Sequence, residues 1–481
     1  MEKNNQMDIN TSIDFLLSQC VDLQTYSNIM KELFQSDFDK KFTYIDSLNI
    51  LPKKSGKEKM KNFQQNVYKI NVYLKTIIKS PSLDIYKVLS CIYGAFLGDA
   101  MGAFCEFEKP NKNNSNCIFR ADNTVIGGAP GQVTDDSEMA LSLAYAIMDN
   151  PKKEELLVDY IYFYYGAWFK TEPLDYGNTT KHALKDFDFT KNNPNLNKFQ
   201  DIEPKIIQGN FNSLSNGFLM RKCTFIAWLY YRFYNEINTV FSSFDNNNIA
   251  LLNLYKKIKN LSIPDTKCTN PNDQTNVVSG VYSLMALMAI KGLNPNLIKY
   301  NITNLCKNAN FINLGSNEKF VSQAILFFFQ LFNKNGFNFS YEFGDSKSPN
   351  NVYDNMGYYL HAFKLTLYFI DQFDYIEPKS PQKKYRTIMN QICDLGGDTD
   401  TNCCIVGAVI GPLIGMNNFG KELKTMIELI PPDRGIYSVS MILLFIIYLK
   451  KSNKDENLVK DNKYFLKQIL TMLYGDIDLD Y

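Results

Sequence analysis

Two short segments of the chain combine paired carboxylates with a threonine hydroxyl. Each segment follows a glycine-containing loop or turn, and neither contains a lysine or arginine that would offset the repulsion between its carboxylates. The two sets of oxygen donors are Thr134, Asp135 and Asp136, and Asp398, Asp400 and Thr401. Carboxylate, hydroxyl and water oxygens are the ligands that Mg²⁺ prefers. The two sets together therefore suit two hard divalent cations about 3.5–4 Å apart.

Helix capping is the alternative explanation for both sets. Each set lies where an apolar helical pattern begins, and Thr and Asp are preferred at helix N-caps. Carboxylates in the first turn also stabilise a helix by about 0.3–1 kcal/mol each through the helix dipole. For any single aspartate capping is the more common role, whereas this many acids and hydroxyls exceed what two helix ends require. Both interpretations stay open from the residues alone.

A third acidic segment, 94–106, carries glycines at regular spacing. It places Asp99 inside an otherwise apolar helical pattern and Glu106 near the end of that pattern. The glycines that recur every four residues are Gly94, Gly98 and Gly102, and again Gly407, Gly411 and Gly415. On a helix this spacing puts glycine on one face, where a neighbouring backbone can approach. Because glycine costs about 1 kcal/mol relative to alanine inside a helix, the stripes predict tight packing or a ligand near the backbone.

The sequence gives little support for zinc binding or for catalysis by a serine or cysteine nucleophile. His182 and His361 are its two histidines, and neither has a metal-ligand spacing or a cysteine beside it. We interpret both as structural or surface residues, which disfavours zinc. No Ser/His/Asp or Cys/His arrangement is visible, and the ten cysteines include no CxxC pair. Free thiols in a reducing compartment are therefore expected.

The elements that must position these residues are expected to be helices. Alternating, strand-like runs are scarce, whereas apolar helical patterns are long and frequent, which predicts an all-α protein. The predicted helices cover residues 88–104, 135–149, 156–169, 219–234, 277–291, 320–332, 356–373, 401–414 and 436–449.

Composition excludes several classes of function. The 51 Lys+Arg and 50 Asp+Glu leave a net charge of +1, which argues against stable nucleic-acid binding. The N-terminus lacks the apolar core of a signal peptide, and the longest apolar runs are too short to span a membrane. We expect a soluble cytoplasmic protein with no membrane contact, and a monomer.

Five motifs together resemble the ADP-ribosylglycohydrolase family. They lie at residues 94–106, 131–139, 175–180, 215–221 and 396–402, in the order and spacing of that family over roughly residues 87–450. The resemblance implies an orthogonal multi-helix bundle with two Mg²⁺ (or Mn²⁺) ions in a central cleft. It also implies an enzyme that hydrolyses the glycosidic bond between ADP-ribose and a modified protein side chain or small acceptor. The domains expected are a helical N-terminal extension at 1–85, a catalytic domain at 86–450 and a tail at 451–481.

The resemblance also implies roles for individual residues. Both donor sets would bind the metal ions, with Asp398 or Asp400 bridging them. The residues implied to transfer protons are Glu106, Asp136 and Asp398. The residues implied to contact the substrate are Asp99, Gly131, Asn216, Gly217 and Asn270. Asn-rich segments near 186–215, 236–275 and 334–355 lie outside the family core. Of two roles, recognition of a protein partner and tolerated surface loops, we favour the second.

The chain departs from the family pattern at the predicted substrate contacts. Ser215 stands where glycine is usual, and bulky Phe218 and Leu219 stand where small residues are common. Asn270 stands where the family often has histidine, so it can donate a hydrogen bond but carries no charge. Two other functions therefore stay open: a catalytically inactive ADP-ribose-binding or crystallin-like structural protein, and a Mg²⁺-dependent phosphohydrolase. The acceptor that carries the ADP-ribose is not determined.

Overall fold

The computed structural model describes residues 83–419, together with Phe445 and Leu449, and leaves out five short internal segments. These segments are 151–156, 171, 189–190, 193–197 and 243–247. The predicted extension up to residue 82, the tail at 451–481 and most of the predicted helix at 436–449 lie outside the described residues.

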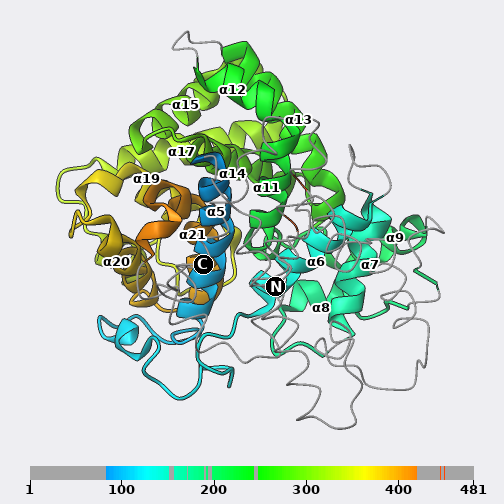
Figure 1. Cartoon of the computed structure of the whole chain (residues 1–481), viewed down its shortest axis with the longest axis horizontal. Helices are drawn as coiled ribbons and strands as arrows, with labels where there is room; N and C mark the ends of the chain where they lie inside the picture. Colours follow the sequence, from blue (N-terminus) through cyan, green and yellow to red (C-terminus); the bar gives the residue numbers. More distant parts are fainter. Residues whose placement is uncertain are drawn as a thin grey trace, which may run out of the picture.

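The described part of the chain is built from helices, which confirms the predicted all-α class (Figure 1). Its only pairing of extended backbone, within the described ranges, is one antiparallel bridge between Ser215 and Tyr358. No described helix is both long and apolar enough to cross a lipid bilayer. The α-helices are α5 (Leu83–Gly102), α6 (Asp135–Asp149), α7 (Val158–Phe169), α8 (Asn178–Leu184), α9 (Phe199–Asn210), α10 (Gly217–Met220), α11 (Lys222–Arg232), α12 (Tyr234–Ser242), α13 (Asn248–Lys267), α14 (Asp273–Lys291), α15 (Pro295–Lys307), α16 (Ala309–Ile312), α17 (Ser316–Phe332), α18 (Phe339–Gly344), α19 (Tyr359–Asp371), α20 (Pro381–Cys393) and α21 (Thr399–Ile414).

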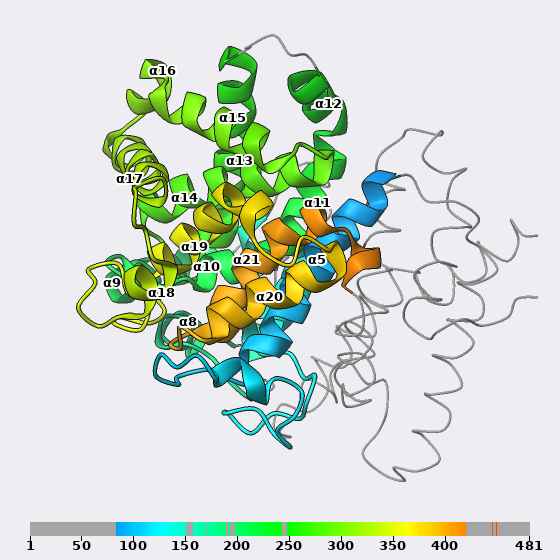
Figure 2. The ribbon, with the colours of Figure 1, turned by 90° about the vertical axis from the view of Figure 1, so that its left-hand side faces the viewer.

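Among the helices that the structure describes, α5 and α21 share the most extensive contact, and they lie side by side in both views (Figures 1 and 2). A Cβ atom built on Gly98 would lie 2.3 Å from the backbone oxygen of Cys403, and one on Gly102 would lie 2.3 Å from that of Thr399. The two helices therefore touch backbone to backbone, as the glycine spacing predicts. They run antiparallel, which brings the end of α5 next to the start of α21. The residues that follow α5 and those that begin α21 consequently share one end of the pair.

Helix α14 lies in the core and is buried from Thr275 to Ile290. Helix α13 packs against it, although its segment falls within 236–275, which the sequence analysis interprets as a loop-like insertion. That interpretation is wrong for α13, because Leu251, Leu254 and Ile258 are all buried. Their spacing of three and four residues is an apolar helical stripe, which the asparagines around it obscure in the sequence.

Candidate metal centre and active site

A cavity of about 400 Å³ lies between the segment that follows α5 and the starts of α6, α8, α10 and α21. Its wall is formed by residues 106–107, 135, 175–180, 215–217, 220, 356–357, 398 and 400–401. No lysine, arginine or histidine is among these lining residues. The acids that line it are Glu106, Asp135, Asp175, Asp398 and Asp400. The cavity wall is therefore rich in carboxyl groups, and no basic residue within it pairs with them.

The two predicted donor sets meet at the starts of α6 and α21. Thr134 and Asp398 occupy the N-cap positions of these helices, yet neither side chain makes a capping hydrogen bond. Thr134 Oγ1 instead lies 3.0 Å from Asp136 Oδ2, and Thr401 Oγ1 donates to the same oxygen at 3.3 Å. Side-chain capping therefore does not explain Thr134 and Asp398, and the hydroxyls of Thr134 and Thr401 are directed toward Asp136 instead.

Several carboxylate oxygens in this region lie close enough to share a cation. One oxygen each from Asp99, Asp136 and Asp400 lie within 4.8 Å of one another, and Asp400 also belongs to a second such group with Glu106 and Asp175. Asp136 Oδ1 and Glu106 Oε2 are buried and have no hydrogen-bond partner. Leaving a buried carboxylate oxygen unpaired is costly. A hard divalent cation would pair it, so these residues fit a metal centre.

The pKa values of these acids are consistent with a site that binds cations. The pKa of Glu106 rises to about 9, first because the side chain is buried and then because other carboxylates lie close. Burial, followed by neighbouring carboxylates, also raises the pKa values of Asp135, Asp136 and Asp400 well above their usual range. A carboxylate in such surroundings becomes ionised at neutral pH when a positive charge is placed beside it. Bound cations would supply that charge.

Asp99 lies behind the cavity and does not line it. Its carboxylate accepts hydrogen bonds from the Thr134 amide at 3.0 Å, from the Ser137 amide at 3.2 Å and from the Ser137 hydroxyl at 2.5 Å. Asp99 is part of α5, whereas the donors belong to the first turn of α6 and its N-cap. These contacts tie the start of α6 to α5 and so position the first donor set.

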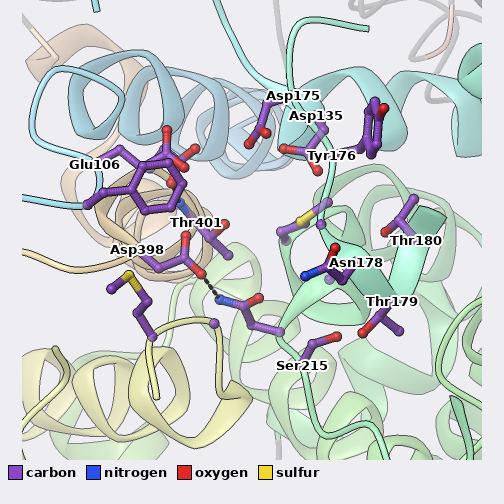
Figure 3. Close-up of a pocket in the computed structure, with 18 residues that line it drawn as sticks. Glu106, Asp135, Asp175, Tyr176, Asn178, Thr179, Thr180, Ser215, Asp398 and Thr401 are labelled. Atoms are coloured by element: carbon purple, nitrogen blue, oxygen red, sulfur yellow. Dashed lines mark hydrogen bonds between the residues drawn. The ribbon is translucent and has the colours of Figure 1, made fainter. Parts of the chain in front are cut away.

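Asn216 and Gly217 both line the cavity. The Asn216 side chain donates from Nδ2 to Asp398 Oδ2 at 2.7 Å (Figure 3), and its backbone amide donates to the Gly357 carbonyl at 2.8 Å. The side-chain amide and the backbone amide of Asn216 therefore both donate to groups within the protein. Asn216 orients Asp398, while Gly217 leaves space, since a Cβ built on it would meet nothing nearer than Thr180 Oγ1 at 3.9 Å.

Gly131 and Asn270, which were predicted to contact the substrate, do not belong to the cavity wall. Gly131 has a φ of +82° in the loop before α6, a conformation that favours glycine. Asn270 is buried and donates from Nδ2 to Ser215 Oγ at 3.0 Å. Two departures from the family pattern, Ser215 and Asn270, are therefore in direct contact, with Ser215 in the cavity wall and Asn270 behind it.

The structure adds residues that the sequence analysis gives no role. Asp175 and the residues up to Thr180 form one side of the cavity, and their motif was visible in the sequence. Phe107 and Met356 also line the cavity, and no sequence signal marked them. Phe107 takes a φ of +61° and is held by a hydrogen bond from its amide to the Gly397 carbonyl at 2.7 Å. The two histidines lie outside the cavity wall, with His182 exposed on α8 and His361 buried on α19.

Comparison with known proteins decides the family. The family model described as ADP-ribosylglycohydrolase matches residues 81–433. The chain belongs to the ADP-ribosylglycohydrolase family. The predicted family is thereby confirmed, and with it the class of enzyme, a hydrolase that acts on the glycosyl bonds of ADP-ribose.

Two relatives and one solved structure are similar to this chain. A putative ADP-ribosyl glycohydrolase of Acanthamoeba polyphaga mimivirus is 27% identical over 332 residues, which cover 67% of this chain and 86% of the relative. The ADP-ribosyl-[dinitrogen reductase] glycohydrolase of Rhodospirillum rubrum is 32% identical over 104 residues, 21% of this chain and 34% of the relative. A structure titled ADP-ribosylglycohydrolase-related protein complex matches with a TM-score of 0.46 and 16% identity, over 76% of this chain and 98% of that one.

Proposed function

We propose that this ADP-ribosylglycohydrolase binds two divalent cations, Mg²⁺ or Mn²⁺, and with them hydrolyses the bond between ribose C1 and an acceptor on a protein or small molecule. The observation that carries the proposal is the meeting of two oxygen-donor sets beside a cavity whose wall holds acids and no basic residue. The ligands proposed are Thr134, Asp135, Asp136, Asp398, Asp400 and Thr401. Among these residues, Asp400 belongs to both groups of carboxylates that could hold a cation.

When bound, such ions activate a water molecule and orient hydroxyl groups of the sugar. Cleavage at ribose C1 also requires proton transfer to the leaving group and from the water. Glu106 and Asp398 are the proposed proton-transfer residues, because both line the cavity. Asn216 holds one oxygen of Asp398 through its side-chain amide. Asp136 is fully buried and outside the wall, so we assign it to metal binding alone rather than to proton transfer.

The experiment that tests the proposal measures free ADP-ribose released from a mixture of ADP-ribosyl-arginine and ADP-ribosyl-serine peptides. We expect release with Mg²⁺ from one of the two peptides and none with excess EDTA. The peptide that is cleaved would identify the acceptor. Asp135→Asn should abolish release, whereas Asp201→Asn, which changes an exposed carboxylate on α9, should leave it unchanged.

Other outcomes point to the other two functions. Binding of ADP-ribose without release from either peptide would favour a non-catalytic, crystallin-like member. Release of inorganic phosphate in place of ADP-ribose would favour a phosphohydrolase. A release rate that EDTA leaves unchanged would contradict the metal-dependent mechanism. The expected monomer is checked separately, by the molar mass in solution.

A further inference from the structure

Four cysteine side chains that do not belong to the cavity wall lie next to one another. Cys105 Sγ and Cys117 Sγ lie 3.6 Å apart, and Cys393 Sγ and Cys403 Sγ lie 3.9 Å apart. The thiols of Cys105 and Cys393 also form a hydrogen bond with each other. All four are free thiols. Their sulfurs therefore form a row in the order Cys117, Cys105, Cys393 and Cys403.

Access from solvent differs along this row. Cys117 ends the short 3-10 helix η1 (Asn114–Cys117) and is partly buried, whereas the other three cysteines are buried. Cys117 Sγ lies 2.8 Å from the Asn114 carbonyl oxygen and 3.1 Å from that of Phe104. A small oxidant from solvent therefore reaches Cys117 first, and the thiol in contact with Cys117 is that of Cys105.

The row suits a disulfide better than a metal ion. A zinc site made of four thiolates holds its sulfurs about 3.8 Å apart in a closed tetrahedron. Among the residues that the structure describes, the groups of three or more side chains placed to share one ion consist of carboxylates, and no thiol belongs to them. Thiols that are neighbours in pairs, without a closed set, are arranged for two-electron oxidation.

Cys105 is coupled to the active site through the backbone. It directly precedes Glu106, whose side chain lines the cavity. The Cys105 amide donates to the Gly102 carbonyl at 2.9 Å, and the Phe107 amide donates to the Gly397 carbonyl at 2.7 Å. Because the sulfurs of a disulfide are about 2.05 Å apart, the 3.6 Å between Cys105 and Cys117 must shorten by about 1.5 Å. Rotation of the side chains supplies part of this change, and a shift of the backbone supplies the rest.

The backbone of Cys117 is the less free of the two to move. The Ser115 amide donates to Asp394 Oδ1 at 2.9 Å, and the Asn111 amide donates to the Asp394 carbonyl at 2.9 Å. These bonds hold η1 and the residues before it to the end of α20. The backbone shift therefore falls on Cys105 and moves Glu106 with it.

We propose that Cys105 and Cys117 form a reversible disulfide when the protein meets a peroxide, and that this disulfide lowers turnover by displacing Glu106. Formation of the disulfide is independent of the proposed function. Its effect on turnover rests on that function, because it is measured as a loss of ADP-ribose release.

The oxidation takes two steps with hydrogen peroxide as the oxidant. The Cys117 sulfur attacks one peroxide oxygen and the O–O bond breaks, which leaves a sulfenic acid, while the departing hydroxide takes up the thiol proton as water. The Cys105 sulfur then attacks the Cys117 sulfur. The S–S bond forms, the S–O bond breaks, and the hydroxyl leaves with the Cys105 proton as a second water molecule.

Two thiols thus lose two electrons, and one peroxide becomes two water molecules. A dithiol reverses the change by thiol–disulfide exchange. Burial, and then the neighbouring Cys105, raise the pKa of Cys117 to about 12, so little of the reactive thiolate is present at neutral pH. We therefore expect slow oxidation that requires sustained exposure to peroxide.

The experiment treats the full chain, loaded with Mg²⁺, with hydrogen peroxide and afterwards with dithiothreitol. Trypsin cleaves between the two cysteines at Lys112, so mass spectrometry after alkylation of free thiols identifies the linked fragments. We expect Cys105 linked to Cys117 and a fall of about 10–100-fold in ADP-ribose release, the usual cost of misplacing a reacting group by about 1 Å. Dithiothreitol should restore the release rate and remove the link.

Two variants separate this disulfide from other oxidation. Cys117→Ser keeps a donor for the Asn114 and Phe104 carbonyls and should keep its release rate through peroxide treatment. Cys306→Ser changes a buried thiol of α15 that is not in the row. It should lose and regain activity as the wild type does.

Four results would overturn the inference: no fragment that links Cys105 to Cys117, a link from Cys105 to Cys393 instead, an unchanged release rate in the linked protein, or an equal loss in Cys117→Ser. The proposed function fails separately. A wild-type chain that forms the link but cleaves neither ADP-ribosyl peptide when reduced would contradict the proposed hydrolysis and not the disulfide.

Discussion

Thr134 Oγ1 and Asp400 Oδ2 lie 3.2 Å apart although 266 positions separate the two residues in the chain. The contact joins the first donor set to the second. It exists because the glycine stripes let α5 and α21 touch, while Asp99 holds the start of α6 against α5. Backbone packing between apolar helices thus brings together carboxylates that repel one another.

Asp400→Asn should abolish metal-dependent release of ADP-ribose, because it removes the carboxylate common to both acidic groups. The metal-free variant should also be more stable than the metal-free wild type, by about 1 kcal/mol, since one buried carboxylate is removed from a like-charged cluster. Thermal unfolding in EDTA and in Mg²⁺ measures both effects. The rise in Tm that Mg²⁺ produces in the wild type should disappear in the variant. A variant with the wild-type response to Mg²⁺ would contradict the ligand assignment.

The stability of the metal-free protein should depend on pH through its buried acids. The pKa values of Glu106 and Asp99 rise to about 9 and about 7, mainly because both are buried, whereas unfolded Glu and Asp titrate near pH 4. The folded state therefore binds more protons than the unfolded state between about pH 4 and pH 9. The contribution of these two acids to the free energy of unfolding consequently falls as the pH rises through that window.

The difference between the wild type and Glu106→Gln isolates this effect from groups of opposite sign. One such group is His361, whose pKa burial lowers to about 4, so that its own contribution rises with pH. Denaturant unfolding in EDTA at several pH values should show the wild type losing stability relative to Glu106→Gln between pH 5 and pH 9. A constant difference across that range would contradict the raised pKa of Glu106.

The acidic cluster was predictable from the sequence because its residues lie in compact segments of unusual composition. Acids beside threonines, without a basic residue, are explained mainly by a bound cation or by helix capping. The structure argues against capping, because neither Thr134 nor Asp398 makes a side-chain capping hydrogen bond. A close contact along each of α5 and α21 was predictable for a similar reason, since glycines four residues apart mark a contact face. That the two glycine faces contact each other is known from the structure alone.

The substrate side of the site could not be predicted in the same way. Whether a side chain lines the cavity depends on tertiary contacts. Ser215 lines the cavity, whereas Asn270 lies behind Ser215 and donates a hydrogen bond to it. Phe107 enters the wall because its backbone adopts a positive φ held by Gly397, which no local pattern indicates. Helix α13 was obscured by the asparagines that surround its apolar stripe.

Asn216→Asp should lower turnover by about 10–100-fold, the usual effect of losing a residue that orients a metal ligand. The substitution replaces the donor to Asp398 Oδ2 with a second carboxylate at the same place. Repulsion should displace the Asp398 side chain and weaken binding of Mg²⁺, which calorimetry without substrate measures directly. Asn294→Asp is the control, because Asn294 is an exposed N-cap of α15 whose side-chain oxygen accepts from the Leu297 amide, a role that aspartate also fills. Unchanged Mg²⁺ affinity together with unchanged kcat would show that Asn216 does not position Asp398.

Gly98→Ala should destabilise the protein by about 3 kcal/mol, as overpacking of a tight core contact does. The added Cβ would lie 2.3 Å from the Cys403 oxygen and 2.6 Å from its carbonyl carbon, and backbone atoms at such a contact cannot move aside as a side chain does. The separation of α5 from α21 should also shift Glu106 relative to Asp400, so turnover of the remaining folded protein should fall.

Gly209→Ala is the matched control, because this exposed glycine of α9 has only His182 Cγ within 4 Å of the added Cβ, at 4.0 Å. It should be neutral or stabilising by about 0.5–1 kcal/mol, since alanine favours a helix more than glycine does. Urea unfolding of both variants in EDTA separates packing from metal binding. Equal stabilities for the two variants would mean that α5 and α21 are not in backbone contact, and the acids at their shared end would then lack the support that brings them together.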